Sequence, residues 1–170
     1  MKTFDVTKEN FNVFEKIGKE WMLISAYDEK RDDVKINTMT ASWGGVGVLW
    51  NKNVFYCFVR PQRFTKEFID AQDIITLSFF GNEYKEALTF CGRNSGRDCN
   101  KIEKCGLTPK ISDGAVLFDQ AKITLVGKKL FAQDMTKDCF IDKALVDMHY
   151  PENDFHTVYV CEIINAYAKD

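Results

Sequence analysis

Two stretches of the chain place polar and cationic side chains at spacings that suit an anionic, partly planar ligand. The first opens with the short hydroxyl and amide residues of 37–42 (NTMTAS), followed by Trp43. After a hydrophobic segment, the same stretch ends in RPQRFT at 60–65. A flat ring could lie against the small residues and Trp43. Arg60 and Arg63 could each bind a phosphate through a planar guanidinium fork.

The second stretch is GRNSGRDCNKIEK at 92–104, where Ser95-Gly96-Arg97-Asp98 matches a capping box. Ser95 would be the N-cap of a helix, and Asp98 its third residue. Free backbone N–H groups at that helix start, together with Arg93 or Arg97, could bind an anion. The alternative is an ordinary helix cap with arginines on the surface.

Periodicity and turn residues predict the elements that position these stretches. A first helix, capped within 7–10, would bury Phe11, Phe14 and Ile17 and end at Gly18. Strands are predicted at 21–27, 36–43, 54–59, 74–80, 115–118, 121–132 and 156–168, and short helices at 66–71, 83–91 and 141–148. Without a regular alternation of strands and helices, this order favours a mainly β fold of Greek-key-like type with short helices.

Several details of these elements can be checked. Thr65 is expected to cap the helix at 66–71, with Phe68 and Ile69 facing inward. The helix at 83–91 should turn one face, with Tyr84, Leu88 and Cys91, toward the core. Residues 44–47 (GGVG) are read as a flexible segment, and Gly127 as a bulge or sharp bend. The hydroxyl-lined face of the strand at 36–43 lies either in solvent at a sheet edge or against a ligand.

Length and composition limit the class of protein. The 170 residues form a single domain, 1–170, with 45% hydrophobic residues and a net charge of -2. This near-balance of charge provides no basic surface for nucleic acid. No apolar run is long enough to span a membrane, and the first residues lack the apolar segment of a signal peptide, so we expect a cytoplasmic protein without a membrane partner. In that compartment the six cysteines are expected to be reduced thiols.

Motifs of the common catalytic classes are missing. The glycines of 44–47 do not complete a dinucleotide-binding fingerprint, and no P-loop, HExxH or GxSxG motif occurs. The two histidines, His149 and His156, are too few for a histidine-rich metal centre, and the cysteines lack the short CxxC spacing typical of zinc sites. We therefore expect no metal site, and assign no catalytic residue.

Taken together, five blocks resemble the flavin reductase family, and most narrowly its flavoredoxin-like bacterial branch. The blocks are 37–47 (NTMTASWGGVG), 60–65, 76–80 (TLSFF), 95–98 and 156–163 (HTVYVCEI). The resemblance implies a split β-barrel that binds FMN at the interface of a homodimer. In the last block, Cys161 stands where members of the family often have glycine.

The resemblance also implies roles for individual residues. The strand and turn at 39–43 would lie along the flavin, and Arg60, Arg63 and Thr65 would bind the ribityl phosphate. Residues 94–98 and Lys101 would approach the phosphate or the ring edge, and His156 the nicotinamide or substrate. The full set expected to bind the cofactor is Asn37, Thr38, Met39, Thr40, Ala41, Ser42, Trp43, Arg60, Pro61, Arg63, Phe64, Thr65, Ser78, Phe79, Asn94, Ser95, Gly96, Arg97, Asp98 and Lys101.

Two functions are compatible with these residues. The first is an oxidoreductase in which NADH or NADPH reduces FMN, and electrons pass to a flavin, a ferric complex or a protein acceptor. The second is an electron-transfer protein that holds FMN and has no pyridine nucleotide site. Because the hydride and electron chemistry belongs to the cofactor, the protein's part is to position and tune it.

Overall fold

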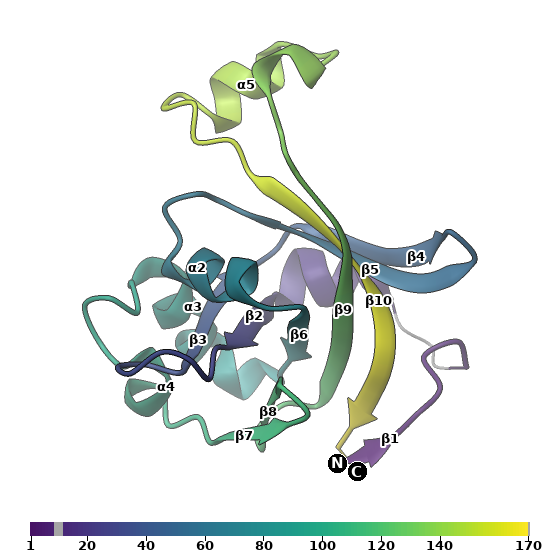
Figure 1. The fold of residues 1–170 in the computed structure, drawn as a ribbon, viewed down its shortest axis with the longest axis vertical. Coiled ribbons are helices and arrows are strands. Elements are labelled where there is room, and N and C mark those ends of the chain that lie inside the picture. Colours follow the sequence, from purple (N-terminus) through teal and green to yellow (C-terminus); the bar gives the residue numbers. More distant parts are fainter. Residues whose placement is uncertain (9–11, 170) are drawn as a thin grey trace.

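The strands form one large antiparallel sheet and one small hairpin in a computed structural model that describes residues 1–8 and 12–169 (Figure 1). The large sheet has the order β3-β2-β6-β9-β10-β5-β4, and β1 pairs with the C-terminal end of β10. Its strands are β1 Lys2–Thr3, β2 Met22–Tyr27, β3 Ile36–Ala41, β4 Gly44–Leu49, β5 Lys52–Val59, β6 Ile74–Phe79, β9 Ile123–Asp134 and β10 Thr157–Ala168; the hairpin is β7 Pro109–Ser112 with β8 Ala115–Phe118.

The two edge strands of the large sheet, β3 and β4, are consecutive in the chain, and only Ser42 and Trp43 lie between them. Seven strands at about 4.8 Å spacing would put the edges of a flat sheet about 29 Å apart. The step from Ala41 to Gly44 can span at most about 11 Å. The sheet must therefore curl until its edges meet at residues 41–44, which we call the seam. Among the described residues no strand pairing joins β3 to β4, so the barrel stays open.

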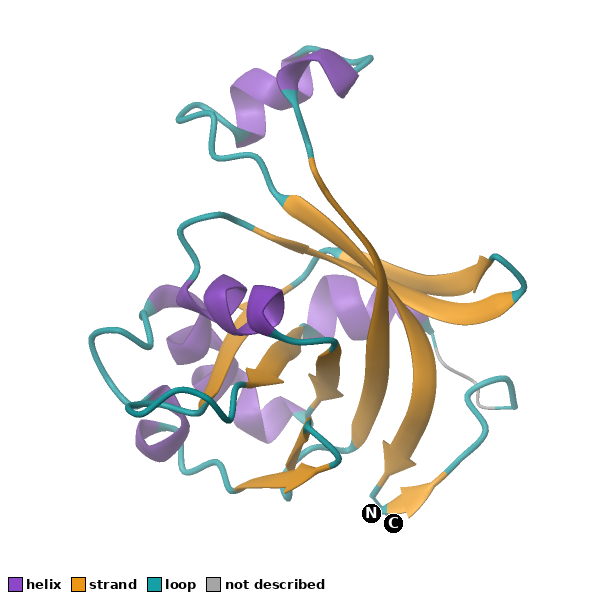
Figure 2. Cartoon of the chain, viewed as in Figure 1, coloured by secondary structure: helices purple, strands orange, loops and turns teal. Residues whose placement is uncertain are grey.

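Short helices surround this curled sheet (Figure 2), and α2 packs against its inner face. They are α1 Val13–Glu15 continuing into the π-helical η1 Lys16–Glu20, α2 Phe64–Ala71, η2 Asn82–Tyr84 with α3 Lys85–Arg93, α4 Lys101–Lys104, η3 Lys137–Cys139 and α5 Ala144–His149. The segment with η3 and α5 joins the ends of β9 and β10 and stands away from the other helices, at the top of Figure 1. None of the described helices is long and apolar enough to cross a membrane.

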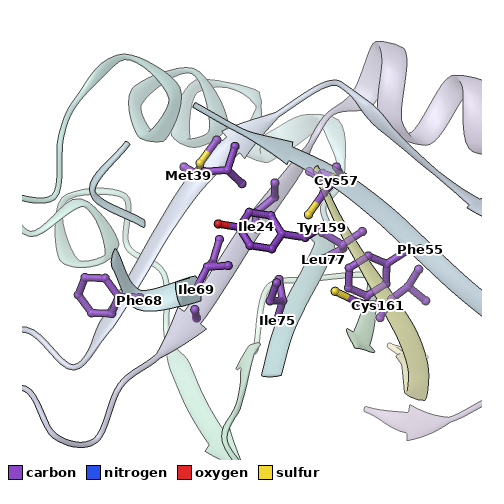
Figure 3. Packing of buried hydrophobic residues seen from close by; sticks show 14 of the residues in the cluster. Ile24, Met39, Phe55, Cys57, Phe68, Ile69, Ile75, Leu77, Tyr159 and Cys161 are labelled. Atoms are coloured by element: carbon purple, nitrogen blue, oxygen red, sulfur yellow. The ribbon is translucent and has the colours of Figure 1, made fainter. Parts of the chain in front are cut away.

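Two buried clusters fill the space inside and beside the sheet. The first packs the inner face of the sheet against α2, with Phe55, Phe68, Leu77 and Tyr159 at 0–1% exposure (Figure 3). The second packs Leu88 and Cys91 of α3 against β8 and its neighbours. These positions confirm the inward faces predicted for Phe68 and Ile69 on α2, and for Leu88 and Cys91 on α3. Tyr84 is partly buried against the second cluster.

The interior also explains one glycine. Gly127 on β9 pairs with Ile163, at one of two register shifts between β9 and β10, which confirms the irregularity predicted there. A Cβ atom at Gly127 would lie 2.3 Å from Cε1 of Phe55 and 2.7 Å from Cβ of Cys161. Only a residue without a side chain lets the Phe55 ring pass so close to the strand.

The first helix differs from the prediction. Asn12 is its N-cap, and the predicted residues Glu9, Asn10 and Phe11 lie outside the described part of the chain. Ile17 is buried as expected, but Phe14 is 89% exposed, and the helix passes Gly18 and ends at Glu20. The turn widens into π-helix, so the spacing that would place Phe14 and Ile17 on one face no longer holds.

The predicted helix starts at Thr65 and Ser95 are wrong. Helix α2 begins at Phe64 with Arg63 as its N-cap, so Thr65 lies inside the first turn. Ser95 begins a turn, in which its hydroxyl accepts from the N–H of Arg97, and the next helix is capped by Asn100 instead. Residues 44–47, expected to be flexible, belong to strand β4, and the strand predicted at 36–43 ends at Ala41.

Candidate functional site

A hollow of about 270 Å³ opens at the seam of the barrel. We call it the seam hollow. One wall is the end of β3 and the link that follows it, and the other wall comes from the end of β5 and the start of β10. The lining residues are Met39, Thr40, Ala41, Ser42, Trp43, Phe58, Arg60, Arg63 and His156. The curl of the sheet therefore brings together three segments that are far apart in sequence.

A second hollow, of about 200 Å³, lies at the N-terminus of α2. We call it the cationic hollow. The lining residues are Gln62, Arg63, Phe64, Thr65, Arg93, Asn94, Ser95, Gly96 and Lys101. Arg63 lines both hollows, which makes them neighbours. The two stretches singled out from the sequence thus meet at one place.

Arg63 is a partly buried cation. Its Nη1 donates to the carbonyl oxygen of Gly92 at 2.8 Å. Burial lowers the pKa of Arg63, and the nearby charge of Arg60 lowers it further. In the part of the chain that the structure describes, no ion pair joins Arg63 to a carboxylate. Its charge is therefore poorly compensated by the protein itself.

Lys101 is a second cation of the same kind. It is only 4% exposed, and its Nζ donates to the carbonyl oxygen of Cys91 at 3.2 Å. Burial lowers the pKa of Lys101 to about 8, and the charge of Arg63 contributes in the same direction. No ion pair with a carboxylate reaches it within the described residues. Two cations that are both withdrawn from solvent, Lys101 fully and Arg63 in part, favour a ligand that carries more than one negative charge.

The start of α2 adds to this preference. Phe64 and Thr65 are the first residues of an eight-residue helix, and both line the cationic hollow. The first N–H groups of a helix have no partner inside it, and the helix dipole is positive at that end. Anions bind readily at such an end when cationic side chains stand beside it. The cationic hollow therefore combines cationic side chains with free backbone N–H groups, which suits an anion.

Arg60 and Arg97, by contrast, are already paired. Arg60 donates to the carboxylate of Asp154 and, at 2.8 Å, to the carbonyl oxygen of His149, and its guanidinium lies 5.1 Å from the Tyr150 ring. Arg60 thereby fastens the segment between β9 and β10 to the seam hollow.

Arg97 donates to Glu67 and to the carbonyl oxygen of Gln62, and its guanidinium lies over the Phe64 ring. Arg97 lines neither hollow. The neighbouring Ser95 and Gly96 do line the cationic hollow. The turn therefore lines the hollow with its small residues, while Arg97 is paired with Glu67 outside it.

His156 is a neutral histidine on the wall of the seam hollow. It is 7% exposed, and burial lowers its pKa to about 4, with the charge of Arg60 acting in the same direction. Its Nδ1 lies 2.9 Å from the hydroxyl of Tyr150. When that hydroxyl donates, the ring carries its proton on Nε2. The ring centroid lies 5.1 Å from that of Trp43 and 6.4 Å from that of Phe58, so the polar group sits among flat apolar ones.

Other residues of the predicted set lie elsewhere. Thr38 is fully buried, and its hydroxyl lies within hydrogen-bond distance of the hydroxyl of Ser25. On the hydroxyl-lined face of β3, Thr38 therefore faces neither solvent nor a ligand. Ser78 and Phe79 are buried in β6, where Ser78 contacts Thr124. Pro61 and Asp98 are exposed and, like Asn37, Thr38, Ser78 and Phe79, line neither hollow.

Asn37 is a special case among these. It is 3% exposed, and its Oδ1 accepts from the N–H of Thr38, but its Nδ2 has no hydrogen-bond partner. A Cβ atom on Gly96, which lines the cationic hollow, would lie 2.7 Å from that Nδ2. An unpartnered amide donor directly behind the hollow is a further sign that the site lacks an acceptor.

Sequence reasoning missed Phe58, Gln62, Tyr150 and Asp154. Phe58 lines the seam hollow, and the carboxylate of Asp154 accepts from both Gln62 and Arg60. The alternation of faces along a strand was the signal for Phe58. It places Phe58 on the face opposite to Phe55, Cys57 and Val59, which are fully buried. No pattern could indicate Tyr150 or Asp154, since their contacts are with residues about 90 positions away or across an irregular loop.

No protein-family profile and no curated protein sequence matches the chain. Solved structures do. Flavoredoxin from Methanosarcina acetivorans is 18% identical with a TM-score of 0.70, covering 98% of this chain and 77% of that one. Flavoredoxin of Desulfovibrio vulgaris is 17% identical with a TM-score of 0.68, covering 98% and 78%. An FMN-binding protein from Thermus thermophilus is 16% identical with a TM-score of 0.67, covering 100% and 83%.

These similarities confirm the fold that the resemblance implied. The chain has the mainly β fold, with short helices, of flavoredoxins and of flavin reductase-like split-barrel proteins. At such low identity the likeness concerns the fold, and the site must be argued from this chain's own residues.

The burial of Lys101 makes a prediction about stability. Its pKa is about 8 in the folded protein against 10.5 for an ordinary lysine. Between these values the unfolded chain binds more protons, so the free energy of unfolding rises with pH. We expect the wild type to gain about 2 kcal/mol from pH 7 to pH 10 relative to Lys101→Met. Urea unfolding at both pH values measures this difference.

Lys104→Met is the matched control, because Lys104 lies on the same short helix but is exposed. This variant should keep the wild-type pH dependence. Identical slopes for the wild type and Lys101→Met would mean that Lys101 carries no burial penalty.

Proposed function

We propose that the chain binds FMN, with the phosphate in the cationic hollow and the flavin ring along the seam, and that it acts as an NAD(P)H-dependent flavin oxidoreductase. One observation carries this proposal. Arg63 is partly buried and Lys101 is buried, neither has a carboxylate partner in the described chain, and both stand next to a hollow that is partly lined by flat rings. A ligand that is dianionic at one end and planar at the other satisfies both hollows.

The residues of the seam suit a flavin ring. Thr40, Ala41 and Ser42 are small, so backbone groups at the end of β3 can approach a ligand closely. Trp43 adds a flat surface that is 41% exposed. FMN, when bound, supplies the hydride and electron chemistry, and the protein orients it and excludes water.

His156 would stand on the substrate side of the ring. Because burial lowers its pKa to about 4, it is neutral at pH 7 and does not act there as a cationic acid. With Tyr150 donating to Nδ1, its Nε2–H is a hydrogen-bond donor for the carboxamide of a nicotinamide or for the carbonyl of an acceptor. Its role is to position the partner of the flavin.

The second candidate is an electron-transfer protein that holds FMN and has no pyridine nucleotide site. Two of the structures with the same fold are flavoredoxins, which favours this alternative. One neighbour described as an NADH:FAD oxidoreductase, from Streptomyces globisporus, favours the reductase. Both candidates use the same two hollows and differ in what reduces the flavin.

We also propose that the protein works as a homodimer. Tyr56 and Phe131 both flank Val160 on the outer face of the sheet, and each is 39% exposed. Trp50 is 56% exposed and its ring lies 6.3 Å from that of Phe131, while Phe58 continues the aromatic stripe from Tyr56 into the seam hollow. A second copy seated on this stripe would cover apolar surface and close the open side of the site.

The reductase proposal is tested by an absorbance spectrum of the protein loaded with FMN, followed by anaerobic addition of NADH and then NADPH. We expect flavin absorbance to bleach with one of the nucleotides. Bleaching by dithionite alone would favour the electron-transfer protein. A protein that neither binds FMN nor consumes a nucleotide would contradict both candidates.

The phosphate site is tested by Arg63→Ala. A charge-assisted contact to phosphate is worth about 1.5–3 kcal/mol, so FMN affinity should fall about ten- to a hundredfold. Quenching of flavin fluorescence measures the dissociation constant. Arg97→Ala is the control, since Arg97 is paired with Glu67 outside the hollow, and it should bind FMN like the wild type. Unchanged affinity in Arg63→Ala would remove Arg63 from the site.

The dimer is tested by Phe131→Glu, which places a charge in the middle of the aromatic stripe. We expect the wild type to be a dimer at micromolar concentration and this variant to be a monomer, because a buried unpaired carboxylate is costly. Light scattering after size exclusion measures the mass. Phe14→Glu is the control, because Phe14 lies in α1, is 89% exposed and is not part of the aromatic stripe. A monomeric wild type would contradict the dimer.

A further inference from the structure

Two cysteines that no proposed role uses lie in contact behind the cationic hollow. The sulfur atoms of Cys91, in α3, and Cys105, directly after α4, are 3.8 Å apart. A disulfide needs a sulfur–sulfur distance of about 2.05 Å, so closure requires an approach of about 1.8 Å. Side-chain rotation with a small shift of the short helix α4 can supply such a movement. Both cysteines are free thiols in this structure.

The two thiols are not equivalent. Cys91 is fully buried, whereas Cys105 is partly exposed. The S–H of Cys105 points at the carbonyl oxygen of Ala87, 3.6 Å away, which leaves Cys91 to donate its S–H to the sulfur of Cys105. Burial raises the pKa of both thiols, to about 12 for Cys91. The hydrogen bond that Cys105 receives acts in the opposite direction and favours its thiolate over that of Cys91. Cys105 is therefore the thiol that a small oxidant meets first, and Cys91 is the one that resolves the product.

The pair is tied to the cationic hollow through Lys101. Lys101 and Cys105 are four residues apart on and just after α4, so they lie on the same side of that helix. The Nζ of Lys101 donates to the carbonyl oxygen of Cys91 itself. A covalent link between Cys91 and Cys105 would consequently fix α4, which carries Lys101, to α3, which supplies the carbonyl oxygen that Lys101 binds.

We propose that Cys91 and Cys105 form a reversible disulfide that fixes Lys101 in the cationic hollow. With a small disulfide as oxidant, the thiolate of Cys105 attacks one sulfur, forms a mixed disulfide and releases one thiol. The thiol of Cys91 loses its proton to solvent, attacks the sulfur of Cys105 and releases the second thiol. Two protein thiols are oxidised and one disulfide is reduced to two thiols, so the exchange is balanced.

The consequence for ligand binding rests on the proposed function. Helix α4 has only four residues, and the hydrogen bond from Lys101 to the carbonyl oxygen of Cys91 ties it to α3. A crosslink to α3 orders it beforehand, and preorganisation of a contact strengthens binding. The oxidised protein is therefore expected to bind FMN several-fold more tightly than the reduced one.

The crosslink is tested on the full chain incubated with 2-hydroxyethyl disulfide and digested with trypsin. Cleavage at Arg93, Arg97, Lys101 and Lys104 puts Cys91, Cys99 and Cys105 on separate peptides. We expect a linked peptide pair, 86–93 with 105–110, that disappears after reduction. This readout is independent of flavin, so it holds or fails separately from the proposed function.

Cys105→Ser removes the partly exposed thiol and should abolish the crosslink. Cys99→Ser is the matched control, because Cys99 is partly buried like Cys105 but lies before α4 and bonds to the carbonyl oxygen of Ser95. In this variant the crosslink between Cys91 and Cys105 should form as in the wild type. A crosslink from Cys99 or from the exposed Cys139, or a lasting mixed disulfide on Cys105, would overturn the proposal.

The link to the site is tested by FMN titration of the oxidised and the reduced protein. We expect a lower dissociation constant after oxidation in the wild type and in Cys99→Ser, and no change in Cys105→Ser. Equal affinities in a protein shown to carry the crosslink would overturn the coupling to Lys101. A protein that forms the crosslink but binds no FMN in either state would contradict the proposed function while leaving the disulfide in place.

Discussion

The arrangement of the whole molecule depends on the two residues between β3 and β4. Ser42 and Trp43 connect the opposite edges of a seven-strand path, and a link this short can exist only if the sheet curls. The curl brings the end of β5 and the start of β10 to the same place, so the seam hollow follows from the connection itself. Because strand pairing does not close the seam, backbone groups there remain available to a ligand.

A charge imbalance defines what the seam can hold. Five cations lie near it. Arg60 and Arg97 have carboxylate partners. Arg63, Arg93 and Lys101 have none within the described chain. Burying unpaired charges lowers the stability of the protein alone, and a bound anion recovers that loss. Under the proposed function, Arg63 and Lys101 lower the stability of the empty protein and raise its affinity for the ligand, which is common where function and folding make different demands on the same residues.

Much of this was predictable from the sequence, and what was missed has physical causes. The strands β2, β5, β6 and β10 follow their hydrophobic patterns closely. Strand β4 was missed because its glycines indicate flexibility, although pairing with β5 orders them. Thr65 and Ser95 carry good capping side chains, but Arg63 and Asn100 occupy the helix starts, since tertiary packing sets where a chain turns. The sequence indicated which cations to consider, and only the fold distinguishes paired from unpaired ones.

Under the proposed function, the two sides of the site are built differently. The cofactor side uses β3 and the first turn of α2, which are anchored in the first buried cluster, together with the turn after α3. The substrate side depends on the segment between β9 and β10, which is fastened to the seam by the pairing of Arg60 with Asp154 and by the contact of Tyr150 with His156. Substitutions that alter the polar contacts of one loop segment are tolerated more readily than substitutions in a core that several elements share. Sequence change in that segment could alter the acceptor while the flavin site stays the same.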